Sequence, residues 1–282
     1  MAHLNSPQKS HYKAVIFDIG GVVMRSPFVA IAAYERELGL PENYINTTMS
    51  GHQFHRIDVV QLRLFYRVGH GSQGAWQKFE RGEIDITTFY PAFSRDLSDT
   101  EKANKWYKAY CERKKIPCPK LPHRLSVNGR ELFGAMMKAS QTYDPYIRAA
   151  ILRIRAEGKH KVIALTNNFA RVDIPESERE FLGWQDGVIP THLLELFDDF
   201  CDSSALGMRK PEPEFYLAAC KRNGIEPKDA IFLDDIGINL KAARELGMDT
   251  IHVQIGKTLE AVKELERRIG INLTDANDKS KL

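Results

Sequence analysis

This sequence of 282 residues has few cysteines, almost no excess of charge of either sign, and no long apolar runs. Its four cysteines, Cys111, Cys118, Cys201 and Cys220, form no CxxC pair and are too few for a disulfide framework, which favours a reducing compartment. Forty Lys and Arg residues against 37 Asp and Glu leave a net charge of +3, without the basic block of a nucleic-acid-binding tail. No apolar run approaches the roughly 20 residues that span a bilayer, and residues 1–12 lack the apolar stretch of a secretion signal. We therefore expect a cytosolic (cytoplasmic) protein that binds neither nucleic acid nor membrane.

Short, nearly continuous apolar runs recur along the chain and predict buried parallel strands. They cover 14–17, 161–165 and 230–233, with a weaker run at 250–253. Helical patterns lie between them at 145–157, 212–223 and 239–246, and each ends just before a glycine. Strands and helices in alternation predict an α/β protein with a doubly wound parallel sheet.

Strand signals are missing between Arg25 and about Tyr143. Segments 28–38 and 100–113 show helical spacing of apolar residues, so 27–143 is predicted to be a helical insertion between core segments 13–26 and 144–271. The ends, 1–12 and 272–282, are expected to be flexible. The stretch 52–71, rich in aromatics and arginine, is interpreted as a surface segment, with a substrate-facing role as the alternative.

Three of the predicted strands end in polar residues. These are Asp18, Thr166-Asn167-Asn168 and Asp234-Asp235. Each cluster alone is ordinary turn chemistry, but the ends of parallel strands converge on one crevice. There they would offer two sources of carboxylate for Mg²⁺ and a hydroxyl for an anion. Lys210 lies just before a predicted helix, from where its ammonium could reach a phosphate; a solvated surface lysine is the alternative.

Four segments resemble, in order, the motifs of the haloacid dehalogenase (HAD) superfamily, and most closely the N-terminal phosphatase-like domain of soluble epoxide hydrolases. They read FDIGGVV, LTNN, GMRKPEPEFY and FLDDIGINLKAARELGM. The similarity covers about 13–26 and 144–256. It implies a Rossmann-like core with an inserted cap domain, and Mg²⁺-dependent hydrolysis of a small phosphate ester. Epoxide hydrolysis belongs to a separate domain of those enzymes, and the sequence has no G-x-S-x-G elbow.

The resemblance also implies roles for individual residues. Asp18 would be the nucleophile, forming an aspartyl-phosphate. Thr166 with Asn167 would bind the phosphoryl oxygens, and Lys210 would steady both the nucleophile and the anion. The implied Mg²⁺ ligands are Asp18, the Gly20 backbone carbonyl and Asp235. Asp234 and Asn239 would shape the same loop.

One position departs from the phosphatase pattern. Phosphatases of the superfamily carry a second aspartate two residues after the nucleophile, which protonates the leaving group, and here that residue is Gly20. General acid–base catalysis contributes about 10²- to 10⁴-fold to a rate. Three readings stay open: a phosphatase with another acid or a good leaving group, a 2-haloacid dehalogenase-type hydrolase, and a catalytically weak phosphate-binding protein.

The substrate is not named by the sequence. The resemblance places the selective contacts in the inserted cap, between Arg25 and Tyr143. An apolar face of that insertion would suit a ligand or a second copy of the chain in a homodimer equally well.

Overall fold

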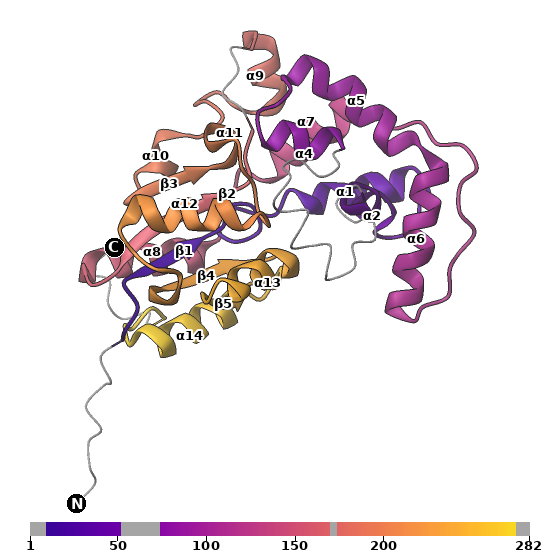
Figure 1. The fold of residues 1–282 in the computed structure, drawn as a ribbon. Helices are drawn as coiled ribbons and strands as arrows, with labels where there is room; N and C mark the ends of the chain where they lie inside the picture. The colour runs from indigo at the N-terminus through magenta and orange to yellow at the C-terminus, as the bar shows by residue number, and fades with distance from the viewer. Residues whose placement is uncertain (1–9, 52–73, 170–173, 275–282) are drawn as a thin grey trace, which may run out of the picture. The chain divides into compact units, whose positions relative to one another are not determined.

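A single parallel sheet forms the centre of one half of the protein. The computed structural model describes residues 10–51, 74–169 and 174–274, and its strands run in the order β3-β2-β1-β4-β5 (Figure 1). The strands are β1 (Ala14–Phe17), β2 (Lys161–Thr166), β3 (Asp199–Asp202), β4 (Ala230–Asp234) and β5 (Asp249–His252). All four pairings are parallel. The predicted doubly wound α/β class is confirmed, and four strands lie within a residue or so of their predicted positions.

Strand β3 is the one that the sequence patterns missed. It is short, lies at the edge of the sheet next to β2, and has a charged residue at each end, Asp199 and Asp202. Only Cys201 and Asp202 within it are buried. The continuous apolar run that predicts a central parallel strand is therefore absent, because an edge strand needs no such run.

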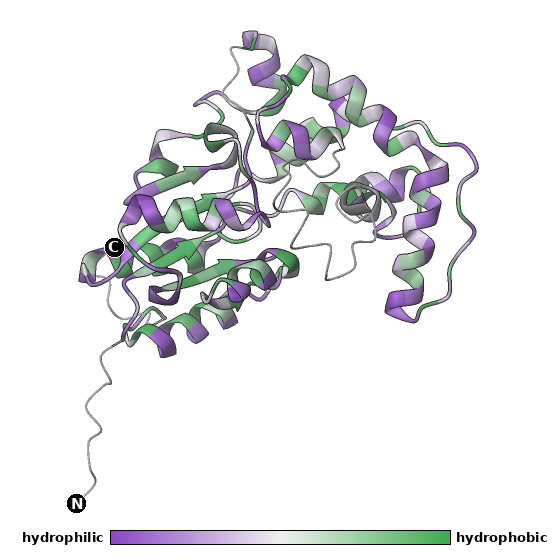
Figure 2. Cartoon of the chain, viewed as in Figure 1, coloured by the Kyte–Doolittle hydropathy of each residue, from purple (hydrophilic) through white to green (hydrophobic). Residues whose placement is uncertain are grey.

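Helices cover both faces of the sheet, because successive side chains of a strand point to opposite sides. Val15 and Phe17 of β1 face α8 (Pro145–Glu157) and α14 (Thr258–Ile269), while Ala14 and Ile16 face α12 (Pro213–Asn223) and α13 (Gly237–Glu245). These helices carry their apolar residues toward the strands and their polar residues outward (Figure 2). The four strand residues are fully buried, which explains the unbroken apolar run at 14–17.

An aspartate caps the start of α8, and glycines end the helices where the sequence predicts them. The Asp144 carboxylate accepts hydrogen bonds from the backbone N–H groups of Tyr146 and Ile147, both at 3.0 Å, at the start of α8. Gly158 ends α8 with a φ of 62°, and Gly224 ends α12 with a φ of 64°, in the left-handed region that favours glycine. Shorter elements of the same half are α10 (Thr191–Leu194), α11 (Ser203–Leu206) and a 3₁₀ turn, η1 (Pro227–Asp229).

The chain divides into two compact units. The α/β unit contains residues 1–26, 140–168 and 186–282, and the helical unit contains 27–139 and 169–185. In the helical unit the structure describes α1 (Phe28–Glu37), α2 (Tyr44–Gly51), α4 (Ala75–Glu80), α5 (Ile86–Ser98), α6 (Thr100–Lys114), α7 (Gly129–Ala139) and α9 (Glu176–Leu182). The predicted helices at 28–38 and 100–113 correspond to α1 and α6. Segment 52–71 lies outside the described residues, and its two interpretations stay predictions.

Residues 169–185 belong to the helical unit, whereas the sequence patterns placed them in the core segment 144–271. Helix α9 is fastened to α7 by the Arg130–Glu178 ion pair at 2.7 Å, and the Arg130 guanidinium lies 3.7 Å from the centre of the Phe181 ring. Phe169 stacks on Phe79 at 4.8 Å within an aromatic cluster. These partners are distant in sequence, so no local pattern could assign the segment.

The ends of the described chain are also more ordered than expected. Tyr12, assigned to a flexible terminus, packs against the core, and Leu273 is 3% exposed. The Leu273 backbone N–H donates to Glu266 Oε2 at 2.7 Å. Across the described ranges, no helix combines the length and the apolar character needed to cross a membrane.

Candidate functional site

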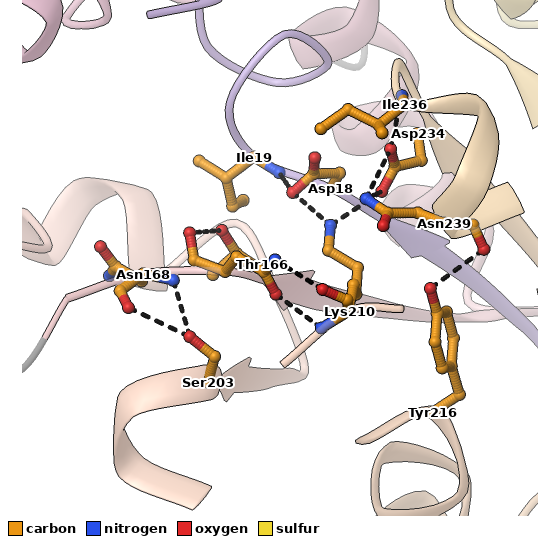
Figure 3. Close-up of polar contacts among 11 residues, drawn as sticks. Asp18, Ile19, Thr166, Asn168, Ser203, Lys210, Tyr216, Asp234, Ile236 and Asn239 are labelled. Atoms are coloured by element: carbon orange, nitrogen blue, oxygen red, sulfur yellow. Dashed lines mark hydrogen bonds and ion pairs between the residues drawn. The ribbon is translucent and has the colours of Figure 1, made fainter. Parts of the chain in front are cut away.

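The side chains predicted to act on a phosphoryl group follow adjacent strands. Asp18 directly follows β1, and its backbone N–H donates to the Leu233 carbonyl at 2.9 Å. Thr166 is the last residue of β2, and Asp234 is the last residue of β4. Because β1 pairs in parallel with both neighbours, these ends meet at one edge of the sheet (Figure 3).

Lys210 is a buried cation held between two carboxylates. Its Nζ lies 2.7 Å from Asp18 Oδ1 and 2.8 Å from Asp234 Oδ2, and its side chain is 1% exposed (Figure 3). Burial lowers the pKa of Lys210, but the two carboxylates outweigh burial and raise that pKa above its ordinary value. The solvated surface lysine that the sequence left open is therefore wrong.

Asn167 positions Lys210 through the backbone. The Lys210 N–H donates to Asn167 Oδ1 at 2.7 Å, and Asn167 Nδ2 donates to the Lys210 carbonyl at 3.0 Å. The side-chain amide of Asn167 is thereby committed on both sides. The predicted contact between Asn167 and a phosphoryl oxygen is left to its backbone N–H.

Asp234 is saturated as a hydrogen-bond acceptor. Besides Lys210, it accepts from the Ile236 N–H at 2.7 Å and from Asn239 Nδ2 at 3.1 and 3.2 Å, and the residue is fully buried. Asn239 is held in turn by Tyr216, whose hydroxyl donates to the Asn239 carbonyl at 3.0 Å. These contacts fit the predicted supporting roles of Asp234 and Asn239, which orient Lys210 and the loop after β4.

Asp235 has one carboxylate oxygen without a hydrogen-bond partner. Its Oδ1 is buried and accepts no hydrogen bond. Burial, together with the charges of Asp234 and Asp18, raises the pKa of Asp235 well above its ordinary value. Gly21 makes room for it: a Cβ at that position would lie 2.2 Å from Asp235 Oδ2, and the Gly21 φ of 91° is open to glycine only. Gly21 escaped the sequence patterns, which gave no reason to single out the second glycine.

The cluster of Asp18, Asp234 and Asp235 fits a metal ion. One carboxylate oxygen from each lies within 4.8 Å of the others. Burial raises the pKa of Asp18 to about 7, with Lys210 opposing the rise and Asp234 adding to it. Three carboxylates therefore share one ammonium in a buried site, and a divalent cation would relieve the repulsion. Oxygen-only donors suit Mg²⁺ better than zinc.

A network around Asn168 was not anticipated from the sequence. Ser203 Oγ accepts from the Asn168 N–H at 2.9 Å and donates to the Asn168 carbonyl at 3.0 Å (Figure 3). Asn168 Nδ2 donates to Asp202 Oδ2 at 3.2 Å. Asp202 faces Thr166 in the β2–β3 register. The network holds the loop after Thr166, whose hydroxyl has only a long contact to the Asn167 carbonyl, at 3.5 Å.

Gly20 contributes backbone alone to this edge. It forms an isolated parallel bridge with Met24, and the neighbouring Gly21 N–H donates to the Met24 carbonyl at 2.8 Å. Unlike Gly21, Gly20 has no positive φ, so its backbone conformation would accept a side chain. The predicted metal ligand at this residue is its carbonyl oxygen, which glycine retains.

The chain is similar in sequence to known proteins over most of its length. Residues 12–247 match the haloacid dehalogenase-like hydrolase family. The chain is 30% identical over 263 residues to acyl-CoA dehydrogenase family member 10 of Mus musculus, covering 93% of this chain and 20% of that protein. It is 28% identical over 262 residues to bifunctional epoxide hydrolase 2 of Sus scrofa, covering 93% and 39%. A sesquiterpene phosphatase of Aspergillus oryzae is 22% identical over 260 residues, covering 92% and 97%. The chain thus spans well under half the length of the mouse and pig proteins.

Proposed function

The chain belongs to the haloacid dehalogenase-like hydrolases, and from that premise we propose that it is a Mg²⁺-dependent phosphatase acting on a small phosphate ester. The observation that carries the proposal is the buried, unpartnered Oδ1 of Asp235 beside Asp18 and Lys210. A carboxylate in that position calls for a cation, and a cation beside a lysine suits a doubly charged anion such as a phosphoryl group. A full-length relative with a phosphatase name supports the same class.

Asp18 is the proposed nucleophile. Its carboxylate attacks phosphorus, and the bond to the leaving oxygen breaks as an aspartyl-phosphate forms. Lys210 already contacts Asp18 Oδ1 at 2.7 Å, so its ammonium orients the nucleophile and meets the negative charge of the incoming phosphoryl group. Water then attacks phosphorus, regenerating the Asp18 carboxylate and releasing inorganic phosphate.

Residues around the nucleophile hold the phosphoryl group and the ion. The Thr166 hydroxyl and the Asn167 backbone N–H are the proposed donors to phosphoryl oxygens, from a loop fixed by the Ser203 network. Asp18, Asp235 and the Gly20 carbonyl are the proposed ligands of Mg²⁺. The bound ion supplies positive charge to the transferring oxygens. Asp234 keeps Lys210 in place and is not needed as a ligand.

The helical unit is proposed to act as the cap that selects the substrate. It interrupts the α/β unit between β1 and α8, and again directly after the Thr166-Asn167-Asn168 loop. In the sequence, both interruptions come shortly after proposed site residues, Gly20 and Asn167. Selectivity would then depend on residues of 27–139 and 169–185.

A 2-haloacid dehalogenase is the second candidate, and Gly20 is the observation that favours it. A halide leaves without a proton, so such an enzyme needs no acid at that residue. It also needs no metal ion, and the buried Asp235 Oδ1 would then remain without any partner. That cost ranks the dehalogenase below the phosphatase.

Phosphate release from p-nitrophenyl phosphate tests the proposal. We expect activity in the wild type with Mg²⁺, and none with a chelator or in Asp18→Asn, which keeps the size of the side chain but removes its charge. Release of halide from 2-chloropropionate, in the absence of phosphatase activity, would replace this function with the second candidate. Inactivity in both assays with Mg²⁺ binding intact would indicate a non-catalytic phosphate-binding protein.

A further inference from the structure

We infer that this site takes phosphoryl groups whose leaving group departs as a stable anion, such as acyl phosphates and phosphoanhydrides, and discriminates against alkyl phosphates. The inference rests on the proposed function and names its substrate class. An alkoxide must be protonated as it leaves, whereas a carboxylate or a phosphate need not be. The question is therefore whether a proton donor lies at the carboxyl edge of the sheet.

The carboxyl groups at this edge are committed as acceptors. Asp234 accepts from Lys210, Ile236 and Asn239. Asp202 accepts from the backbone and hydroxyl of Ser204, at 2.8 and 2.7 Å, and from Asn168. Both side chains are thus held by donors of the protein itself, on both carboxylate oxygens, and neither is turned toward a leaving group. Asp18 is the nucleophile, and Asp235 is the carboxylate left for the ion.

The other titratable groups at this edge are also engaged. The Lys210 ammonium is bound by Asp18 and Asp234. His252, at the end of β5, has its Nε2 3.1 Å from the Asp235 backbone carbonyl. A carbonyl only accepts hydrogen bonds, so Nε2 carries the proton and donates it to the backbone.

The hydroxyls at this edge do not supply an acid either. Ser203 donates to the Asn168 carbonyl, and Tyr216 donates to the Asn239 carbonyl. An aliphatic hydroxyl such as that of Thr166 is too weak an acid to protonate an alkoxide to advantage. Gly20, between Asp18 and Gly21, has no side chain. Among the described residues of this edge, none is placed to protonate a leaving oxygen.

The chemistry balances without an acid for one class of substrate. With an acyl phosphate, an Asp18 oxygen bonds to phosphorus while the bond from phosphorus to the acyl oxygen breaks, and its electron pair leaves on the carboxylate. No proton moves in this step. Water then adds to phosphorus, the Asp18–phosphorus bond breaks, and the proton released from water passes to solvent. With an alkyl phosphate, the same first step would expel an unprotonated alkoxide, which is far less stable.

The experiment compares leaving groups in the wild-type protein with Mg²⁺. The substrates are acetyl phosphate, glycerol phosphate and a series of aryl phosphates from p-nitrophenyl to unsubstituted phenyl phosphate. We read kcat/KM, because it reports the steps up to cleavage of the leaving group. Without an acid, kcat/KM should fall by about 10²- to 10⁴-fold along the aryl series, and glycerol phosphate should lie lower still.

Three variants test whether Gly20 is the position at which a proton donor is absent. Gly20→Asp introduces a carboxyl group beside the nucleophile and should flatten the dependence on the leaving group, mainly by speeding the poor substrates. Gly20→Asn has the same size without an acidic proton and should keep the steep dependence. His252→Gln should keep it as well.

The outcomes separate the two proposals. A shallow dependence in the wild type, with Mg²⁺- and Asp18-dependent turnover, would overturn the substrate class and leave the phosphatase standing. A steeper dependence in His252→Gln than in the wild type would show that His252 donates a proton, with the same consequence. Failure to hydrolyse any of these substrates would overturn both proposals. If Gly20→Asp does not fold, the wild-type series still decides the question.

Discussion

Replacing Lys210 with Met removes the one ammonium between two buried carboxylates and should destabilise the α/β unit. Asp18 and Asp234 are 8% and 0% exposed at their side chains, so neither can recover hydration when Lys210 is lost. Removing one partner of a buried ion pair costs about 3–5 kcal/mol, which is a large part of the roughly 5–15 kcal/mol that stabilises a typical protein. Met fills the space of the lysine chain, so the loss reports charge and not a cavity.

Hydrogen exchange followed by mass spectrometry measures this loss at the site itself. In the presence of chelator, peptides covering β1 and β4 should lose protection by about 10²- to 10⁴-fold, which is the same free energy expressed as a ratio. Lys241→Met is the matched control, because the Lys241 side chain is 70% exposed and its pair with Glu245 is long, at 3.8 Å. It should leave protection unchanged.

Neutralising one carboxylate should restore part of the stability. In Lys210→Met/Asp234→Asn, only one of the two carboxylates that contact Lys210 keeps its charge, and an Asn can still accept from the Ile236 N–H. Protection of β1 and β4 should therefore rise above that of the single variant, without a return of activity. Unchanged protection in Lys210→Met would refute the view that Lys210 is the counter-ion of this site.

Three further predictions follow from other parts of the structure. Gly21→Ala places a Cβ against Asp235 Oδ2 and strains a φ of 91°, so calorimetry should show Mg²⁺ affinity at least about tenfold weaker, whereas Gly39→Ala, with the same kind of φ but open space, should bind Mg²⁺ normally. Asp202→Ala leaves Asn168 Nδ2 without its acceptor and should weaken competitive inhibition by inorganic phosphate with little change in Mg²⁺ affinity; equal weakening of both would contradict it. Burial lowers the pKa of His160 below its ordinary 6.5, with the Tyr12 carbonyl partly opposing, so the neutral form stabilises the fold above about pH 6.5 and stability falls as pH drops through the lowered pKa. The unfolding free energy of His160→Gln should lack this fall, and parallel pH curves for the two proteins would refute it.

The sequence contains enough to predict the core of the fold. Residues 14–17, 162–165 and 230–233 are buried on both faces of the sheet, so each stretch has an unbroken apolar run. Edge strand β3 lacks such a run and was missed. Segment 169–185 joins the helical unit through Arg130–Glu178 and ring contacts far apart in sequence, which no local pattern contains. The resemblance to the HAD superfamily, drawn from four motifs, is confirmed by the family match over 12–247.

The sequence predicts the site residues that lie at the ends of apolar strands. It does not predict the contacts that depend on the edge strand β3 or on close approach of side chains. Asp18, Thr166 and Asp234 end strands that are visible as apolar runs, so their convergence follows from parallel pairing. The Asp202 network depends on β3, which the sequence patterns missed. The use of the Asn167 amide to hold Lys210, and of Gly21 to admit Asp235, depends on distances of a few ångströms that spacing does not encode.

The central claim is that Asp18 carries the phosphoryl group during turnover, and locating that group tests it most directly. The protein is mixed with Mg²⁺ and acetyl phosphate, quenched in acid within the first turnovers, and its peptides are analysed by mass spectrometry. The account predicts one phosphoryl group on the peptide that contains Asp18, absent with chelator and absent in Asp18→Asn. A phosphoryl group on another residue, or steady turnover that persists in Asp18→Asn, would contradict it.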